Sequence, residues 1–201
     1  MNIGLFALAV VVAIVLVGGV PLLYGWLFKF SSRTANDVYP FLIKIDMEAI
    51  YGTFHPDPEK HFRETLSEAE FKQMQLKRFH LAIHYCNQLA NNAQVFLSWT
   101  RYERKQEWIA SGPAVIRNTV RELRISSLKF LAAGFIIRAH LRWWLFRMAL
   151  LPFAAPPSFE NLLAAGSWDM ISIYEKIQQQ AELFSFCFGD EYHDKLMDAM
   201  H

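Results

Sequence analysis

Residues 79–97 read FHLAIHYCNQLANNAQVFL, and apolar side chains recur in this stretch at three- and four-residue spacing. Such spacing gathers side chains on one face of an α-helix. Upstream, Ser67 and Glu70 have the spacing of a capping box, in which two side chains satisfy free N–H groups at a helix start. No glycine or proline follows until Gly112-Pro113, which predicts one helix of roughly 42 residues. Its apolar face comprises Phe79, Ala82, Ile83, Cys86, Leu89, Ala90, Ala93, Phe96 and Leu97.

A turn at Ser111-Gly112-Pro113 leads into a second long helix. Pro113 suits the first helical position, because the N–H group that proline lacks has no partner there in any case. The helix can continue to about Leu151, where Pro152 stops it. Two long helices joined by a short turn pack antiparallel. The sequence therefore predicts an antiparallel helical hairpin at the centre of an all-α fold.

One or two shorter helices are expected after the hairpin. Residues 154–166 contain Pro156-Pro157 and predict a loop. Ser167 can cap the next helix, and Gly189 suits its end. A short terminal helix from Asp190 to Met200 is expected to follow. The apolar face of the helix that begins at Ser167 comprises Met170, Ile173, Tyr174, Ile177, Ala181, Phe184 and Phe188.

Residues 41–51 fit two structures. Apolar and charged residues alternate from Ile43 to Ala49, which is typical of a strand. Pro40 suits a first helical turn and Gly52 suits a helix end. No other segment offers a strand partner, and a lone strand leaves its backbone groups without hydrogen bonds, so we favour a helix. Residues 53–58 predict a loop.

The chain carries no charged side chain before Lys29. A run of this length and apolarity can cross a bilayer, which needs about 20 residues. Because Pro21 interrupts it, the span either covers residues 2–20 and is followed by an interfacial segment, or is one kinked helix to Phe28. A cleaved signal peptide is the rival interpretation, but the run lacks a basic start and a small-x-small cleavage site. We therefore predict an uncleaved, single transmembrane anchor over residues 1–30.

The basic flank of this anchor predicts its orientation. Lys29 and Arg33 follow the apolar run, so residues 29 onward are expected on the cytoplasmic side. A linker with a short helix over residues 31–66 would then lead into a helical bundle domain over residues 67–201. Cys86 and Cys187 form no CxxC motif and are expected to be reduced, in agreement with that location. The small-xxx-small pair Ala9 and Ala13 leaves a homo-oligomer as an alternative, although such pairs are common in apolar helices.

The second helix of the hairpin carries the candidate binding site. Its arginines fall within about 100° of one another on a helical wheel, beside a broad apolar and aromatic face. Arginine heads can reach anionic lipid phosphates while the aromatic rings lie deeper, as in helices that lie in a membrane interface. The residues predicted to bind a membrane or a membrane-protein partner are Arg117, Arg121, Arg124, Arg138, Arg142, Trp143, Trp144 and Phe146.

Two other interpretations of this helix stay open. The arginines are equally consistent with a solvated face that pairs with the acidic last helices, while the aromatic residues pack in the core. Residues 128–151 also form a borderline second span. There, Arg138 and Arg142 cost about 2.5–3.5 kcal/mol each, and some ten apolar residues at about 0.3–0.6 kcal/mol each roughly cancel that cost.

Histidines provide the only candidates for a metal or cofactor site. His80 and His84 lie four apart on the first long helix, and His193 follows Asp190 by three residues. Two imidazoles alone are an incomplete site, and a second Glu-x-x-His motif is absent. The sequence has no GxSxG motif and no glycine-rich phosphate loop. A metal- or cofactor-binding membrane enzyme therefore stays an alternative, and no catalytic residue is assigned.

These patterns together predict a non-enzymatic, membrane-anchored scaffold or accessory subunit. Its basic and aromatic helix would bind membrane lipid or a membrane-protein partner. A two-span membrane protein with intramembrane arginines is a further alternative. Nucleic acid is a less suitable partner, because the net charge is only +1 and no nucleic-acid-binding motif is present.

Overall fold

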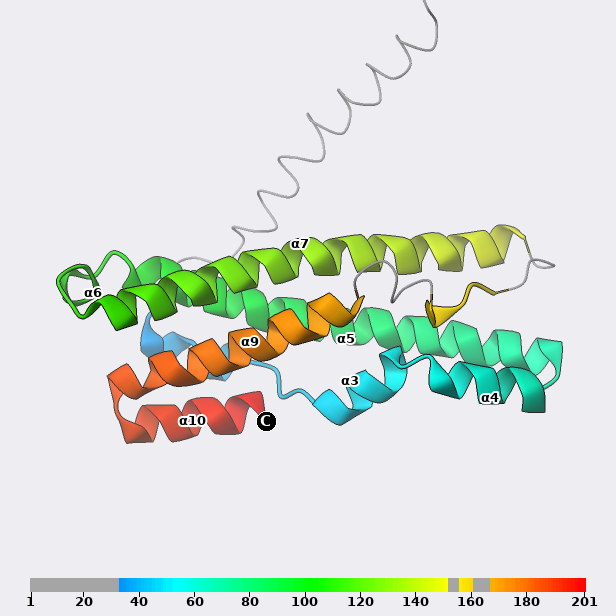
Figure 1. Cartoon of the computed structure of the whole chain (residues 1–201), viewed down its shortest axis with the longest axis horizontal. Helices are drawn as coiled ribbons and strands as arrows, with labels where there is room; N and C mark the ends of the chain where they lie inside the picture. The colour runs from blue at the N-terminus through cyan, green and yellow to red at the C-terminus, as the bar shows by residue number, and fades with distance from the viewer. Residues whose placement is uncertain (1–32, 152–155, 161–166) are drawn as a thin grey trace, which may run out of the picture.

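The computed structural model describes residues 33–151, 156–160 and 167–201 (Figure 1). Every regular element within these ranges is a helix, which confirms the all-α class for this part of the chain. The predicted anchor over residues 1–30 lies outside the described residues. None of the described helices, α7 included, is both long enough and apolar enough to cross a membrane.

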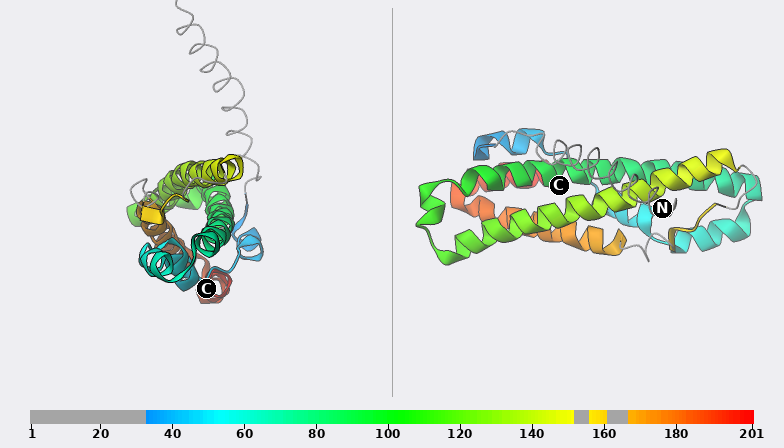
Figure 2. Two further views of the ribbon diagram at one scale, coloured as in Figure 1. Left: turned by 90° about the vertical axis from the view of Figure 1, so that its right-hand side faces the viewer. Right: turned by 90° about the horizontal axis from the view of Figure 1, so that it is seen from above.

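Two long helices form the predicted hairpin. Helix α5 (Glu68–Glu103) and helix α7 (Ala114–Leu150) lie side by side along most of the molecule (Figures 1 and 2). The capping box is present at the start of α5: the Glu70 N–H donates to Ser67 Oγ at 3.4 Å, and the Ser67 N–H donates to Glu70 Oε2 at 3.1 Å. Pro113 occupies the N-cap position of α7, one residue before the first helical residue, so the predicted start of the second helix is confirmed to within one residue.

The first helix is shorter than the sequence predicts, because it ends at Glu103 rather than near Gly112. A turn follows, and then a short helix, α6 (Glu107–Ala110). The turn places the Trp108 ring parallel to that of Phe184, with centroids 6.4 Å apart, and buries Ile109. No helix-breaking residue marks this point in the sequence, so tertiary contacts account for the turn.

The C-terminal helices complete the core. Helix α9 (Ser167–Ser185) packs along α7, and α10 (Asp190–Met200) returns along α9 after the short 3-10 turn η4 (Phe186–Phe188) (Figure 1). Gly189 allows this reversal with a φ of 95°, a conformation that favours glycine. Five residues of the predicted apolar face are buried, namely Met170, Tyr174, Ile177, Ala181 and Phe184. Ile173 and Phe188 are only partly buried, and Phe188 lies in η4, because α9 ends at Ser185 rather than at Gly189 as predicted.

The chain before the hairpin contains more helix than predicted. Two 3-10 turns, η2 (Ala35–Asp37) and η3 (Tyr39–Phe41), precede α3 (Met47–Phe54) and α4 (Asp57–Thr65). Asp46 caps α3 by accepting a hydrogen bond from the Ala49 N–H at 3.0 Å. Gly52 lies inside α3 rather than at its end. The sequence predicts a loop over residues 53–58, but only two residues separate α3 from α4.

Residues 42–46 are extended even though no strand lies beside them. The Ile43 N–H donates to Asn92 Oδ1 at 2.8 Å, and Asn92 Nδ2 donates to the Ile43 carbonyl at 2.7 Å. The side-chain amide of Asn92 thus provides both hydrogen bonds that a neighbouring strand would give. This contact explains why the alternating pattern is extended in its first half and helical only from Met47.

The C-terminal part of α5 is enclosed on all sides. All seven residues from Gln94 to Thr100 are buried, and the Arg33 N–H reaches the Ser98 carbonyl at 3.5 Å. The last helix contacts the start of the described chain, because the Tyr192 hydroxyl of α10 donates to the Ala35 carbonyl at 2.9 Å. The rings of Tyr39 and Tyr192 also meet edge to face.

Candidate functional site

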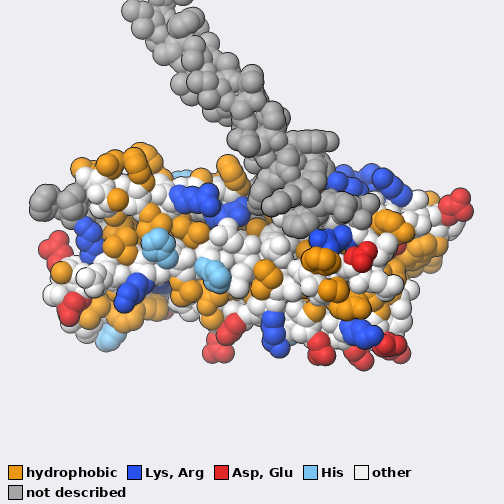
Figure 3. All heavy atoms as spheres, turned by 180° about the vertical axis from the view of Figure 1, so that it is seen from behind, with side chains coloured by type: hydrophobic (Ala, Val, Ile, Leu, Met, Phe, Trp, Pro, Cys, Tyr) orange, Lys and Arg blue, Asp and Glu red, His pale blue; other side chains and the backbone are white. Residues whose placement is uncertain are grey.

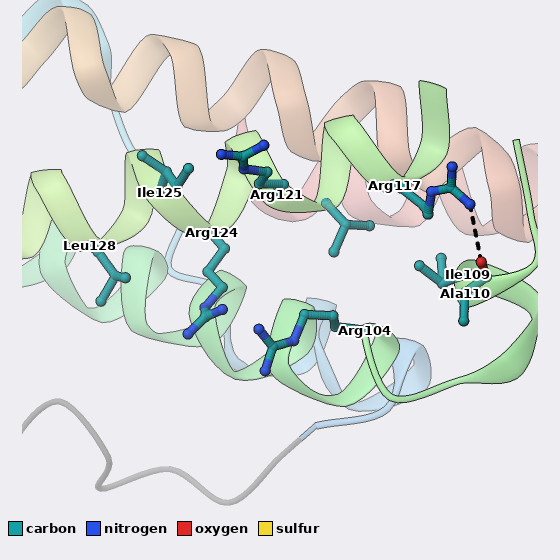
Figure 4. A pocket seen from close by; sticks show the side chains of 9 residues that line it. Arg104, Ile109, Ala110, Arg117, Arg121, Arg124, Ile125 and Leu128 are labelled. Atoms are coloured by element: carbon teal, nitrogen blue, oxygen red, sulfur yellow. Dashed lines mark hydrogen bonds between the residues drawn. The ribbon is translucent and has the colours of Figure 1, made fainter. Parts of the chain in front are cut away.

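The predicted arginines divide between two places on α7. Arg117, Arg121 and Arg124 lie near its start, where they line one groove of about 500 Å³ together with Arg104 from the end of α5 (Figure 4). We call this the arginine groove. The remaining lining is largely apolar and consists of Ile109, Ala110, Val120, Ile125 and Leu128.

The groove holds its arginines in different ways. Arg117 Nη1 donates to the Ala110 carbonyl at 3.1 Å and to the Gly112 carbonyl at 3.4 Å, so the α6–α7 turn fixes this guanidinium. Arg124 and Arg104 extend toward each other from neighbouring helices (Figure 4). Burial, followed by the nearby charges of Arg104 and Arg101, lowers the pKa of Arg124.

Two acidic residues near the groove, Glu103 and Glu122, are engaged elsewhere. The Glu103 side chain turns into the core, where burial raises its pKa. Glu122 pairs with Lys176 of α9 at 3.0 Å, and this hydrogen bond, together with the charges of Lys176 and Arg121, lowers its pKa. Within the described ranges, no salt bridge joins Arg104, Arg117, Arg121 or Arg124 to an acidic residue. The groove therefore concentrates positive charge.

Arg138 lies inside the hairpin, apart from the other arginines. Its Nε donates to the Gly134 carbonyl and its Nη1 to Asn87 Oδ1, both at 3.0 Å, and only 9% of its surface is exposed. Burial lowers the pKa of its guanidinium. Arg142 is exposed. The five arginines predicted as one stripe thus include one that fastens α7 to α5.

The adjacent tryptophans of α7 face opposite ways. Trp144 is buried and packs on Phe79 of α5, with ring centroids 5.4 Å apart. Trp143 is 58% exposed, and its ring lies beside that of Phe146, which is 53% exposed. Of the aromatic residues predicted to bind a membrane or partner, Trp143 and Phe146 are therefore accessible and Trp144 belongs to the core.

Trp143 and Phe146 belong to a longer exposed apolar strip. Ala132, Ile136, Ala139, Trp143, Phe146 and Leu150 recur at alternating four- and three-residue spacing, which places them on one side of α7, and Phe135 adjoins them. We call these seven residues the outer face of α7. Hydrophobic side chains gather over this end of the molecule in Figure 3. The opposite side of α7 is buried through Phe130, Ile137, Leu141, Trp144 and Met148.

Basic residues border the outer face. Lys129 and Arg147 lie on one side of it and Arg142 on the other, and all three are exposed. No acidic residue occurs in α7 after Glu122. The second half of α7 therefore presents apolar side chains between cations, without an opposing charge on the same helix.

The histidines form no cluster in the described part of the chain. His80 and His84 are exposed on α5. His193 hydrogen-bonds through Nδ1 to Ser185 Oγ at 2.7 Å and stacks on Phe186, so it stabilises the turn between α9 and α10. Across the described ranges, no three histidine, cysteine or acidic side chains lie close enough together to hold a metal ion.

No protein-family model, curated protein or solved structure matches this chain. The two α7 surfaces therefore provide the evidence for what this chain binds. Sequence reasoning missed Arg104, because it placed this residue inside an uninterrupted helix. Arg104 continues the last turn of α5, with its N–H bonded to the Thr100 carbonyl, and the packing of α5 against α7 brings it opposite Arg124 (Figure 4).

Proposed function

We propose that this chain is a membrane-associated helical scaffold or accessory subunit whose α7 outer face docks on an anionic membrane surface. The observation that supports the proposal is the exposure of Phe135, Ile136, Trp143, Phe146 and Leu150, which ranges from 48% to 63%. A continuous strip of large apolar side chains on the surface of a folded bundle is typical of a docking surface rather than of a solvated face.

The chemistry of the outer face suits the boundary between lipid headgroups and acyl chains. Phe146 and Leu150 would lie among the acyl chains, and the amphipathic ring of Trp143 at the boundary. The flanking Arg142, Arg147 and Lys129 would lie near lipid phosphates, where each basic residue contributes about 1 kcal/mol. Arginine and apolar side chains bind and position rather than react, so the role proposed is that of a scaffold.

The uncharged N-terminal run supports the same assignment. An anchor formed by residues 1–28 would keep the body next to the bilayer and raise the effective concentration of lipid at the outer face. A modest intrinsic affinity of the outer face would then suffice for docking. The body is proposed to lie on the cytoplasmic side, where anionic lipids are enriched.

Lipid contact can be tested with the full chain in nanodiscs. In a background with Cys86 and Cys187 replaced by serine, Phe146→Cys and Leu150→Cys are labelled one at a time with an environment-sensitive fluorophore. The matched control is Leu183→Cys on α9, because Leu183 is also an exposed leucine, at 51%. Lipids brominated along their acyl chains quench only a fluorophore that lies within the bilayer.

We expect strong quenching at positions 146 and 150, little at 183, and weaker quenching when anionic lipid is replaced by neutral lipid. Equal quenching at all three positions, or none at any, would contradict lipid docking. A label at 146 that is shielded in native membranes but not quenched in nanodiscs would instead favour a membrane-protein partner and overturn the lipid version.

A further inference from the structure

The arginine groove lies toward the other end of α7 from the exposed aromatic residues and has a different chemistry. We infer that it is a binding site for a phosphate monoester whose organic part is apolar. The inference does not depend on docking of the outer face, because different side chains form the groove and a soluble ligand can test it.

The charge of the groove points to a multiply charged anion. Arg104, Arg117, Arg121 and Arg124 line one concave surface, and within the described ranges none of them forms a salt bridge, although the charge of Arg121 acts on Glu122. Arg104 and Arg124 point toward each other (Figure 4), so their guanidinium groups repel one another, and a bound dianion relieves that repulsion. Guanidinium forks match phosphate oxygens in pairs, so several arginines can contact one phosphate together.

The Arg117 contacts show that part of the groove is already in position. Its guanidinium donates to the Ala110 and Gly112 carbonyls, which leaves its other N–H groups for a ligand. Arg104 and Arg124 face each other across the groove (Figure 4), so one anion between them would contact both α5 and α7. Glu107 is the remaining acidic residue near this turn, and it is exposed on α6.

The apolar residues that line the arginine groove indicate which organic group the phosphate carries. Ile125 and Leu128 are partly exposed and supply apolar surface next to the arginines, whereas Ile109 and Val120 are almost fully buried. A volume of about 500 Å³ is that of a small-molecule site. An organic phosphate with an aliphatic part can therefore place its head on the arginines and its chain on Ile125 and Leu128. Phosphatidic acid and a soluble phosphate monoester share this chemistry.

Calorimetric titration of the full chain, held in neutral-lipid nanodiscs, tests the site. The probes are butyl phosphate, inorganic phosphate and butanol. We expect saturable binding of one butyl phosphate per chain, weaker binding of inorganic phosphate and none of butanol. The double variant Arg104→Gln/Arg124→Gln should weaken butyl phosphate binding by about tenfold or more. Ile125→Ser should reduce the preference for butyl phosphate over inorganic phosphate.

The matched control is Arg142→Gln/Arg147→Gln, which removes two exposed arginines from the same helix outside the groove. Its affinity for butyl phosphate should stay at the wild-type value, and thermal unfolding verifies that both double variants are folded. Absence of saturable binding by the wild type, or an equal loss in both double variants, would overturn the inference. Neither result bears on quenching at position 146, so the two proposals fail separately.

Competition distinguishes the two sources of the phosphate. Nanodiscs that contain phosphatidic acid present a lipid monoester, whereas phosphatidylglycerol presents only a diester. If phosphatidic acid alone displaces butyl phosphate, the site takes a lipid headgroup. If neither lipid displaces butyl phosphate, the site takes a soluble ester. Both results support the monoester site.

Discussion

Asn92 of α5 and Ile43 of the extended segment are joined by two hydrogen bonds, one to the backbone N–H and one to the carbonyl of Ile43. The same Asn92 amide donates to the Tyr174 hydroxyl at 3.0 Å. One fully buried side chain on α5 thus connects the segment before α3 with α9.

Replacing Asn92 should therefore destabilise the bundle. Asn92→Ala leaves the Ile43 backbone groups without these partners, and each buried unsatisfied group costs about 1–3 kcal/mol. We expect a loss of about 3 kcal/mol, seen as a thermal midpoint roughly 6–12 °C lower. Asn91→Ala is the matched control, because Asn91 makes a single, more exposed bond to the Phe41 carbonyl. Similar midpoints for the two variants would contradict the role of Asn92.

The two adjacent tryptophans of α7 should respond differently to truncation. Trp144→Ala removes a buried ring that packs on Phe79, which costs about 3–5 kcal/mol of unfolding free energy. Trp143→Ala removes an exposed ring and should change stability by less than about 0.5 kcal/mol. Chemical denaturation in neutral detergent compares them. Trp143→Ala should instead reduce membrane contact at position 146.

Arg138 and Arg142 should also differ in how their substitution affects stability and membrane contact. Arg138→Ala removes hydrogen bonds to Asn87 and Gly134 inside the hairpin, and the expected loss is about 1.5–3 kcal/mol of stability. Arg142→Ala should leave stability within about 0.5 kcal/mol of wild type but reduce the dependence of membrane contact on anionic lipid. The opposite assignment of the two effects would show that Arg138 belongs to the docking surface.

The hydrogen bond between Tyr51 and Glu175 should make the stability of the fold fall in alkaline solution. The Tyr51 hydroxyl donates to Glu175 of α9, and chiefly this hydrogen bond, then burial and the Glu175 charge, raises its pKa from 10 to about 12. A folded-state pKa above the unfolded one means that the contact stabilises the fold below pH 10 and is lost as the pH rises toward 12.

Comparison with Tyr51→Phe isolates this contact from other alkaline titrations. The wild type should have the higher thermal midpoint below pH 10, and the gap should close between pH 10 and 12. A gap that stays constant over this interval would show that the hydrogen bond to Glu175 does not contribute. Tyr85→Phe serves as the control, because Tyr85 is also a partly buried tyrosine.

Local signals in the sequence predict much of this fold. The Ser67–Glu70 box and Pro113 mark helix starts through backbone chemistry that acts within a few residues, and both lie at the predicted starts to within one residue. Gly189 marks the reversal before α10, although α9 itself ends earlier, at Ser185. The spacing of apolar residues likewise identifies the buried side of α9. These features depend on neighbours in sequence, which is why a single chain reveals them.

Features that depend on distant residues escape such reasoning. The end of α5 at Glu103 depends on the packing of Trp108 on Phe184, and the extended segment depends on Asn92. A helical wheel places Arg138 beside Arg142, but it does not show that Arg138 turns toward α5 and donates a hydrogen bond to Asn87. The arginine groove needs Arg104 from another helix, so only the folded chain assembles it.

The contact between Tyr192 and Ala35 sets an order of events during synthesis. Residues 33–41 leave the ribosome early, yet their partner α10 is made after every other described helix. Tyr192 lies in the first turn of α10, so the contact with Ala35 cannot form until the start of this last helix has emerged from the ribosome.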